Sequence, residues 1–423
     1  MRRDRGRDLR VPRLPAGRVT AFELASFPAD LLAVDRGRIE RLVTDEPALA
    51  GVEVEVVAPG APVRVTHILD AVEPRIRPDG RPAFPTEGRA GTGRTNRLDG
   101  VAVLSCADFP GEERPLHEQE SIVDLEGPGA ALTPFGSLTN VVLDFEPAEG
   151  VGHFALDEAV RRVTLAVAEL VAEPTLAAEP EEIERFELGP GDEELPAVAA
   201  LIQLSDLGQL YYQYLYGTPV GQAGLPRALD PAELLDGAVT CGEYHWAALR
   251  NPTLFFQRNE LVRALYSEHG NRLRFAGVVL TRGYEQTAED KQRAAERAAD
   301  AALALGADGV VITTDAGGNS HTDTMLTCRA CERAGIKTAV IVAEMADPEA
   351  TSPGLTDWVA EADCIVSAGN AEELVDEWMP ARVLGGETLL DGTPAAAAGR
   401  VPVRNYLGAT NQMGQGALQA TAW

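Results

Sequence analysis

The chain has 423 residues, too many for one hydrophobic core, so two or three domains are expected. Hydrophobic residues make up 45% and charged residues 24%, as in ordinary globular proteins. The 65 acidic and 37 basic residues give a formal charge of −28, which argues against nucleic acid and anionic membranes as partners, because both need a basic surface. A small anionic substrate stays open, since one arginine can bind a carboxylate locally.

The sequence predicts a cytoplasmic location. No apolar run is long enough to span a membrane, and no apolar segment follows the basic residues 1–15, so a signal peptide is not expected. An odd number of cysteines in a large chain argues against a disulfide framework and favours a reducing compartment. The five cysteines are Cys106, Cys241, Cys328, Cys331 and Cys364.

The first part of the chain, residues 38–145, is predicted to be mostly β. Short runs rich in β-branched residues are separated by Gly and Pro, which is typical of strands joined by turns. Hydrophobic residues recur at helical spacing over 153–172. An acidic surface connection is expected over 172–195, followed by a buried strand at 196–204. The predicted β runs are 52–59, 63–69, 100–106 and 140–146.

From residue 272 the pattern changes to alternating strands and helices. The long helix over 285–306 ends at Gly306, and Thr322 or Asp323 is predicted to cap the next helix. Strands are predicted at 272–282, 307–315, 337–345 and 362–369, and helices at 285–306 and 322–335. Continuous apolar strands between helices indicate a parallel sheet covered on both faces.

The predicted fold class is therefore α/β, with a β-rich N-terminal half and a doubly wound, mainly parallel α/β C-terminal half. We expect a β-rich domain at residues 1–150, a mixed α/β region at 151–240 and a Rossmann-like α/β domain at 241–423. Ligands in such sheets bind at the carboxyl ends of the strands.

Several motifs have plain structural interpretations. Cys328 and Cys331 share one helix face, and without a second pair they are expected to face a core, as are Cys106 and Cys364 in apolar strands. The glycine-rich stretch 88–100 lacks the spacing of a phosphate loop. No metal or nucleotide is predicted.

The only two lysines give no sign of a Schiff base. Lys291 falls in a charged helical pattern typical of a surface, and Lys337 opens an apolar strand. Neither position resembles a desolvated, reactive lysine.

The loop and helix start at 313–324 form a candidate site. Gly318 and Asn319 are candidate substrate-binding residues, because glycine lets backbone approach a ligand and a helix start offers free N–H groups. His321 and Asp323 are a candidate proton-transfer pair. Arg282, at a strand end, is a candidate for binding a substrate carboxylate, with a solvated surface charge as the alternative.

The junction Thr240-Cys241-Gly242 leaves three interpretations open for its thiol. Cys241 is a buried structural residue, a nucleophile partnered by a base such as His245, or the source of a pyruvoyl group. In the third case the thiol attacks the carbonyl of Thr240, and elimination then cuts the chain and leaves a 2-oxoacyl group at the new amino terminus. The small residue Gly242 would leave room for this reaction.

Five stretches resemble the proprotein of the substrate-binding component, component B, of glycine, sarcosine and betaine reductases. The related proprotein of D-proline reductase is similar. The resemblance covers nearly the whole chain, and several of the stretches are long and unusual. They are DAVEPRIRPDG (70–80), GTGRTNRLDGVAVL (91–104), GPGAALTPFGSLTNVVLDFEP (127–147), DGAVTCG (236–242) and LGADGVVITTDAGGNSHTDTMLTCRACERAGIKTAVI (305–341).

The resemblance implies cleavage between Thr240 and Cys241, with Cys241 becoming a covalent pyruvoyl cofactor. A small amino acid or amine would form an imine with it, and a selenol or thiol on a partner subunit would then attack for reductive C–N cleavage. His245, His321 and Asp323 are the candidates for proton transfer. The expected subunits are residues 1–240 and 241–423.

The chain departs from the glycine type at Thr240, where that type has Asn and the D-proline type has Thr, so the substrate stays open. Two alternatives remain. One is a pyruvoyl-dependent decarboxylase that acts without a partner. The other is an unprocessed binding or scaffold subunit that retains an intact Cys241.

Overall fold

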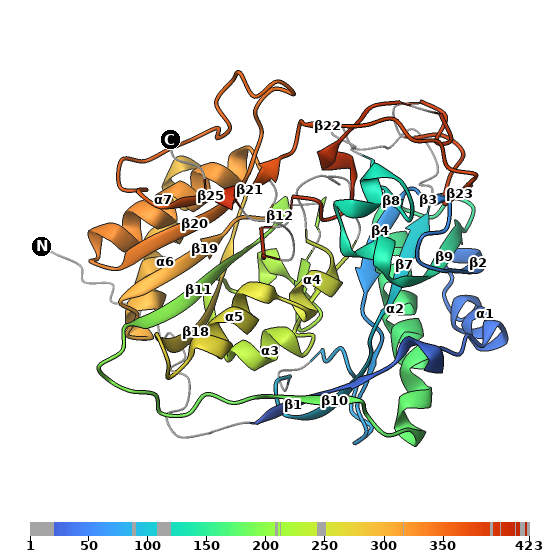
Figure 1. Ribbon diagram of the computed structural model, residues 1–423, viewed down its shortest axis with the longest axis horizontal. Helices are drawn as coiled ribbons and strands as arrows, with labels where there is room; N and C mark the ends of the chain where they lie inside the picture. The colour runs from blue at the N-terminus through green and yellow to red at the C-terminus, as the bar shows by residue number, and fades with distance from the viewer. Residues whose placement is uncertain are drawn as a thin grey trace, which may run out of the picture.

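The structure is a computed structural model of the 423-residue chain. It describes residues 21–86, 90–107, 120–207, 210–211, 213–242, 251–315, 317–389, 392–397, 399–410, 412–414 and 419–420. The fold is mixed α/β, with several mixed sheets and one sheet rich in parallel strands (Figure 1).

The N-terminal half contains two mixed four-stranded sheets, with strand orders β10-β1-β6-β5 and β2-β9-β7-β4. Their strands are β1 (Phe22–Phe27), β2 (Leu49–Val57), β4 (Ile68–Val72), β5 (Arg75–Ile76), β6 (Gly93–Leu98), β7 (Val101–Ala107), β9 (Thr139–Pro147) and β10 (Glu182–Phe186). Apolar side chains of both sheets share one core with α1 (Arg36–Thr44) and α2 (His153–Ala172). Strands lie over each of the four predicted β runs, and the predicted helix at 153–172 is α2.

The 172–195 connection holds more structure than the sequence predicted. It begins with the 3-10 helix η4 (Glu173–Ala177), and β10 then pairs antiparallel with β1. The stretches 127–129 and 132–136, rich in Gly and Pro, form the 3-10 helices η2 (Pro128–Ala131) and η3 (Pro134–Ser137).

The second half is built on a seven-stranded sheet of order β16-β18-β11-β19-β20-β21-β25. The five central strands run parallel, whereas both edge strands are antiparallel. The strands are β11 (Ala197–Leu204), β16 (Arg227–Leu229), β18 (Arg274–Arg282), β19 (Gly309–Thr313), β20 (Lys337–Glu344), β21 (Ile365–Asn370) and β25 (Gln419–Ala420). The predicted parallel sheet is confirmed; the doubly wound arrangement stays a prediction.

Helices cover both faces of this sheet. Ala199 and Leu201 of β11 pack with apolar residues of α6 (Ala288–Ala304) and α7 (Asn319–Arg333). Ala200 and Ile202 belong to the core that contains α3 (Pro231–Leu235), α4 (Thr253–Gln257) and α5 (Glu260–Glu268). Alternate residues of a strand point to opposite faces, which explains this division. Figure 1 shows α3, α4 and α5 between the large sheet and the N-terminal sheets.

Small sheets complete the fold. Strand β14 (Gln213–Leu215) lies between β15 (Thr218–Pro219) and β17 (Val239–Cys241). The C-terminal part of the chain crosses back to the N-terminal half, where β23 (Arg382–Leu384) pairs in parallel with β3 (Val63–Val65), which also pairs with β8 (Val123–Asp124). Two further pairs are β12 (Asp206–Leu207) with β13 (Leu210–Tyr211), and β22 (Leu374–Val375) with β24 (Val401–Pro402).

The cysteine predictions hold for three of the four residues in question. Cys328 and Cys331 are buried in the core on the α6–α7 face, and Cys106 is buried in β7. Cys364 is exposed and precedes β21, so its prediction as a buried strand residue is wrong. The apolar run that suggested a strand begins one residue later, at Ile365.

Candidate functional site

The Thr240–Cys241 bond lies inside the short strand β17. This strand pairs antiparallel with β14, which sets Tyr214 opposite Thr240 and Gln213 opposite Cys241. Thr240 is 5% exposed and Cys241 is fully buried. The site is therefore screened from bulk water, and polar groups here need protein partners.

The start of α4 holds the backbone and the thiol of Cys241. The amide N–H of Cys241 donates to Oγ1 of Thr253 at 2.7 Å, and its thiol donates to the carbonyl of Asn251 at 3.1 Å. Both acceptors are buried and lie on either side of Pro252. The position of Cys241 is thus fixed by two contacts to one turn of chain.

Asp70, in β4, holds that turn from the other side. Its Oδ2 accepts the hydroxyl of Thr253 at 2.6 Å, while its Oδ1 accepts the backbone N–H groups of Thr253 at 2.9 Å and Ala71 at 2.8 Å. Asp70 is 5% exposed. Two consecutive hydrogen bonds therefore connect the amide nitrogen of Cys241 to a buried carboxylate.

Asp315, just after β19, connects the candidate loop to Cys241. Its Oδ1 accepts the backbone N–H and the side-chain amide of Asn251 at 3.1 and 2.8 Å. Its Oδ2 accepts from the hydroxyl of Ser205 at 2.8 Å and the amide of Gln213 at 2.5 Å. Burial raises the pKa of the Asp315 carboxyl, while these neutral donors oppose the rise. Asp315 thus contacts both Asn251 and Gln213, the two neighbours of Cys241.

Gly242 makes a close approach that no other residue would permit. A Cβ atom there would lie 2.7 Å from Cε2 of Tyr214 and 3.0 Å from Oδ2 of Asp157. The hydroxyl of Tyr214 donates to that same Asp157 oxygen at 3.1 Å, and the guanidinium of Arg161 lies 4.0 Å from the Tyr214 ring centroid. Tyr214 is held on two sides, so it has little freedom to move away.

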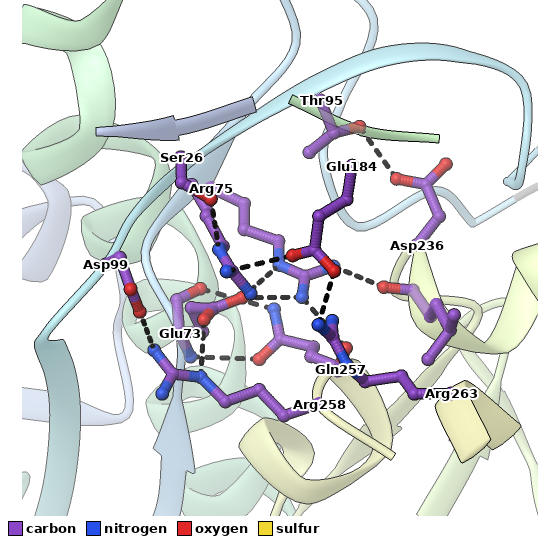
Figure 2. A network of polar contacts seen from close by, with 12 residues as sticks. Ser26, Glu73, Arg75, Thr95, Asp99, Glu184, Asp236, Gln257, Arg258 and Arg263 are labelled. Carbon is purple, nitrogen blue, oxygen red and sulfur yellow. Dashed lines mark hydrogen bonds and ion pairs between the residues drawn. The ribbon is translucent and has the colours of Figure 1, made fainter. Parts of the chain in front are cut away.

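A buried ionic network occupies the segment that follows Asp70 (Figure 2). The fully buried carboxylate of Glu73 accepts from Nε of Arg75 at 2.7 Å and from Nε of Arg258 at 2.5 Å. Burial alone would raise the pKa of Glu73, but these guanidinium groups outweigh it and hold the pKa far below its usual range. The backbone N–H of Glu73 also donates to Oε1 of Gln257 at 2.9 Å. Gln257 and Arg258 lie at the end of α4.

The same network reaches the chain before Cys241. Arg77 forms a buried ion pair with Asp236, and the hydroxyl of Thr95 donates to Asp236 at 2.7 Å. Arg75 donates to the carbonyl of Leu235. The network therefore includes Leu235 and Asp236, which precede the Thr240–Cys241 bond, and Gln257 and Arg258, which follow it (Figure 2).

The loop predicted to bind substrate forms the start of α7. Gly318 is the N-cap with φ of +63°, and Asn319 is the first helical residue. A positive φ favours glycine, which accounts for Gly318. The helix begins three residues earlier than predicted. The prediction that Thr322 or Asp323 caps it is therefore wrong, because both lie inside the helix.

His321 is fully buried in α7, with its Nδ1 3.2 Å from Oγ1 of Thr356. Burial lowers the pKa of the imidazole to about 4. The ring is consequently neutral near pH 7 and would be a poor proton donor at that pH.

Asp323 forms a buried ion pair with Lys291 of α6. Both carboxylate oxygens lie 2.8 Å from Nζ of Lys291, and Oδ2 also accepts the backbone N–H of Tyr284 at 2.8 Å. The side chain of Lys291 is 9% exposed, so the prediction of a surface lysine is wrong. Burial raises the pKa of Asp323, and the ammonium group of Lys291 opposes the rise. Asp323 thus joins α7 to α6 and to the chain after β18.

The remaining candidates differ in how far the structure describes them. Arg282 ends β18 with its guanidinium 3.8 Å from the carboxylate of Glu285, and its side chain is 27% exposed. Its role toward a substrate carboxylate stays a prediction. His245 lies outside the described residues.

Hydrogen bonds thus link Cys241 through Asn251 to Asp315 of the candidate loop. The other two candidates of that loop have different partners: His321 contacts Thr356, and Asp323 contacts Lys291. Sequence reasoning missed the residues in contact with Cys241. For Asp70 there was a signal, since an acid inside the apolar run 68–72 indicates a buried polar contact. Asn251 and Thr253 gave no comparable signal.

Two further observations concern the described part of the chain. No group of three or more His, Cys, Asp or Glu side chains within it could hold a metal ion. None of its helices is both long and apolar enough to cross a membrane.

Comparison with known proteins identifies similar sequences over most of the chain. The model of the family described as glycine/sarcosine/betaine reductase component B subunits matches residues 17–420. The chain is 34% identical over 344 residues to the glycine reductase complex component B subunits alpha and beta of Acetoanaerobium sticklandii, covering 79% of this chain and 78% of the relative.

Two relatives come from Peptoclostridium acidaminophilum. The sarcosine reductase complex component B subunit alpha is 33% identical over 358 residues, or 82% of each chain. The betaine reductase complex component B subunit alpha is 31% identical over 386 residues, or 86% of this chain and 84% of the relative. No solved structure matches the chain significantly.

Proposed function

Because the chain belongs to the family of glycine/sarcosine/betaine reductase component B subunits, we propose that it is the precursor of a pyruvoyl-dependent, substrate-binding reductase component. In this proposal the chain cuts itself between Thr240 and Cys241. The second fragment then binds a small amino acid or amine, and a thiol or selenol on a partner subunit completes reductive cleavage of its C–N bond.

The observation that carries this proposal is the setting of Cys241. The thiol and amide nitrogen are each held by a buried acceptor, Asn251 and Thr253, within a strand that water does not reach. Gly242 follows without a side chain to hinder the reacting bond. These two contacts hold the thiol and the amide nitrogen of Cys241 in fixed positions beside the bond to be cut.

Two further observations support a division at this bond. The name of the relative from Acetoanaerobium sticklandii gives two subunits, alpha and beta, for one matching sequence. In this chain the ionic network binds residues on both sides of the bond, so a cut would leave the two parts attached to one another.

The 2-oxoacyl group would supply a carbonyl electrophile that makes the C–N bond of a bound amine easier to break. The residues that fit around it are those that now hold Cys241. Thr253 presents a hydroxyl and Asn251 a carbonyl to residue 241. Each is in turn hydrogen-bonded to a buried carboxylate, Thr253 to Asp70 and Asn251 to Asp315.

The roles first expected of His321 and Asp323 need adjustment within this proposal. With a pKa near 4, His321 would serve as a neutral group and not as an acid near pH 7. Asp323 is engaged by Lys291 and by the backbone of Tyr284, which suits a structural role. Asp70 and Asp315 therefore become the carboxylates proposed to act nearest the reacting residue.

Reductive trapping tests the proposed function. The purified protein is incubated with glycine, sarcosine or D-proline and sodium cyanoborohydride, and its fragments are weighed by denaturing mass spectrometry. We expect one of these amines to raise the mass of the 241–423 fragment only, by the mass of the amine less one oxygen atom, because the carbonyl oxygen leaves as water. The Cys241→Ala variant, which lacks the thiol, should gain no mass.

Other outcomes would favour the alternatives. An uncut chain whose Cys241 alkylates quantitatively would indicate an unprocessed binding subunit. Cleavage followed by release of carbon dioxide from an amino acid, without any thiol-bearing protein, would indicate a decarboxylase.

A further inference from the structure

We infer that Thr253 is a catalytic residue of the chain cleavage and that Asp70 acts through it as a positioning and proton-storing residue. This inference rests on the proposed cleavage at Thr240–Cys241. It gives a role to Asp70, the first of the acidic residues in the 70–80 segment, which lies inside the apolar strand β4.

The geometry singles out the nitrogen that must leave. Oγ1 of Thr253 lies 2.7 Å from the amide nitrogen of Cys241 and 2.6 Å from Oδ2 of Asp70. Thr253 is fully buried, as is Cys241, so bulk water does not reach this nitrogen to supply a proton. The hydroxyl is therefore placed between the leaving atom and a carboxylate.

The first step of the cleavage needs such a group. A bond forms between Sγ of Cys241 and the carbonyl carbon of Thr240, and the bond from that carbon to the nitrogen of Cys241 breaks. The thiol loses one proton and the nitrogen gains one, so the step is neutral in protons and electrons. In the resting chain the hydroxyl of Thr253 accepts the N–H of Cys241 and donates to Asp70. In our inference the thiol leaves the carbonyl of Asn251 and passes its proton to Asp70. The hydroxyl of Thr253 then turns to give its proton to the nitrogen as the C–N bond breaks, and Asp70 reprotonates it.

The later steps complete the balance. Residue 241 loses its Cα proton and its Cβ–Sγ bond, and the sulfur stays on Thr240 as a thiocarboxylate. The cut frees residue 241 as a new amino terminus, which water can then reach. Water replaces its nitrogen, ammonia leaves, and a ketone remains there. Neither oxidant nor reductant is required. Thr253 is needed for the first step, before the Cβ–Sγ bond breaks.

Holding the start of α4 would not by itself require the contact between the hydroxyl of Thr253 and Cys241. Asp70 also accepts the backbone N–H of Thr253, which by itself would hold the start of α4. The hydroxyl contact to Cys241 is additional, and it falls on the one backbone nitrogen whose bond must break. Asn251, on the thiol side, offers a carbonyl, which is not a base that could take the proton.

The test compares three proteins for the rate of cleavage after synthesis in a cell-free system, followed by denaturing mass spectrometry. Thr253→Val keeps the shape of the side chain and removes the hydroxyl, whereas Thr253→Ser keeps the hydroxyl. General acid–base groups contribute about 10²–10⁴-fold to rates, so we expect Thr253→Val to cleave at least about 100-fold more slowly than wild type. Thr253→Ser should stay within about tenfold of wild type, because its hydroxyl can still transfer the proton.

Hydroxylamine separates the first step from the later ones, because it cuts a thioester once it has formed. If Thr253 acts in the first step, hydroxylamine will not restore cleavage of Thr253→Val. Asp70→Asn should likewise be slow and not be rescued, while keeping the circular dichroism spectrum of the wild type. Asp70→Asn keeps the test decisive if Thr253→Val fails to fold.

Thr164→Val is the matched control for loss of a buried hydroxyl, since the hydroxyl of Thr164 donates within α2 to the carbonyl of Val160 at 2.7 Å. It should cleave like wild type. Normal cleavage of folded Thr253→Val or Asp70→Asn, or rescue of either by hydroxylamine, would overturn the inference. A wild-type chain that stays uncut would instead contradict the proposed function.

Discussion

At the scale of single residues, the surroundings of Cys241 combine full burial with hydrogen bonding. An unsatisfied buried polar group costs about 1–3 kcal/mol, so the contacts from Asn251 and Thr253 are needed if Cys241 is to stay in the core. Asp315 adds a buried carboxylate that accepts four hydrogen bonds from neutral donors. Such a group is retained at a cost in folding free energy, which is typical of functional sites.

His321 predicts a dependence of stability on pH. Its pKa is about 4 in the folded protein and about 6.5 when unfolded, so the unfolded state binds more protons between these values. The free energy of unfolding should therefore fall as pH drops from 6.5 toward 4. From pH 7.5 to 5 the loss due to His321 is about 2 kcal/mol, since each pKa unit corresponds to about 1.4 kcal/mol.

Urea unfolding at pH 7.5 and pH 5 checks this prediction, in an uncleaved Cys241→Ala background. His321→Gln carries no titrating ring, so it should lose about 2 kcal/mol less than its parent over this range. Equal losses in the two proteins would contradict the assignment of a low pKa to His321.

At the scale of elements, α4 is held at both ends by the segment around β4. Asp70 binds its first residue, Thr253, and Glu73 binds Gln257 at its last. A helix of five residues is not stable alone, so these contacts fix its position. Because the start of α4 holds Cys241, the β4 segment positions the reacting residue indirectly.

The ion pair between α6 and α7 predicts a large loss of stability. Asp323→Asn would leave the buried ammonium of Lys291 without a counter-charge, which costs about 3–5 kcal/mol. Glu158→Gln is the matched control, since it removes the carboxylate partner of Arg162 in a pair whose side chains are 49% and 48% exposed. Exposed pairs contribute about 0–1 kcal/mol. Chemical unfolding of both variants measures their free energies of unfolding. Similar losses of free energy in the two variants would contradict the prediction.

The sequence alone predicted the regular elements of the parallel sheet because local signals define them. Apolar strands and the helix-ending Gly306 required no knowledge of distant contacts. Lys291 was misplaced because its partner, Asp323, lies 32 residues away in sequence. The contact between Asp70 and Thr253 spans 183 residues, so composition and periodicity could not reveal it. Around the bond, the sequence singled out Thr240, Cys241 and Gly242 on their motif, but none of the side chains that hold them.

At the scale of the whole molecule, the Thr240–Cys241 bond does not divide the fold into separate bodies. β11 and β16 come before this bond, and β11 lies between β18 and β19, which come after it. The ionic network of Figure 2 adds buried contacts between residues 73–77 and residues 257–258. A cut chain should therefore remain one folded particle under native conditions.

Denaturing mass spectrometry of a native gel-filtration peak tests the central claim most directly. We predict that wild-type protein elutes as one peak that resolves, once denatured, into residues 1–240 and residues 241–423, the second beginning with a 2-oxoacyl group. The Cys241→Ala variant should give one intact chain of about 45.0 kDa. A wild-type peak that contains only the intact chain, with a Cys241 thiol that alkylates fully, would contradict the account.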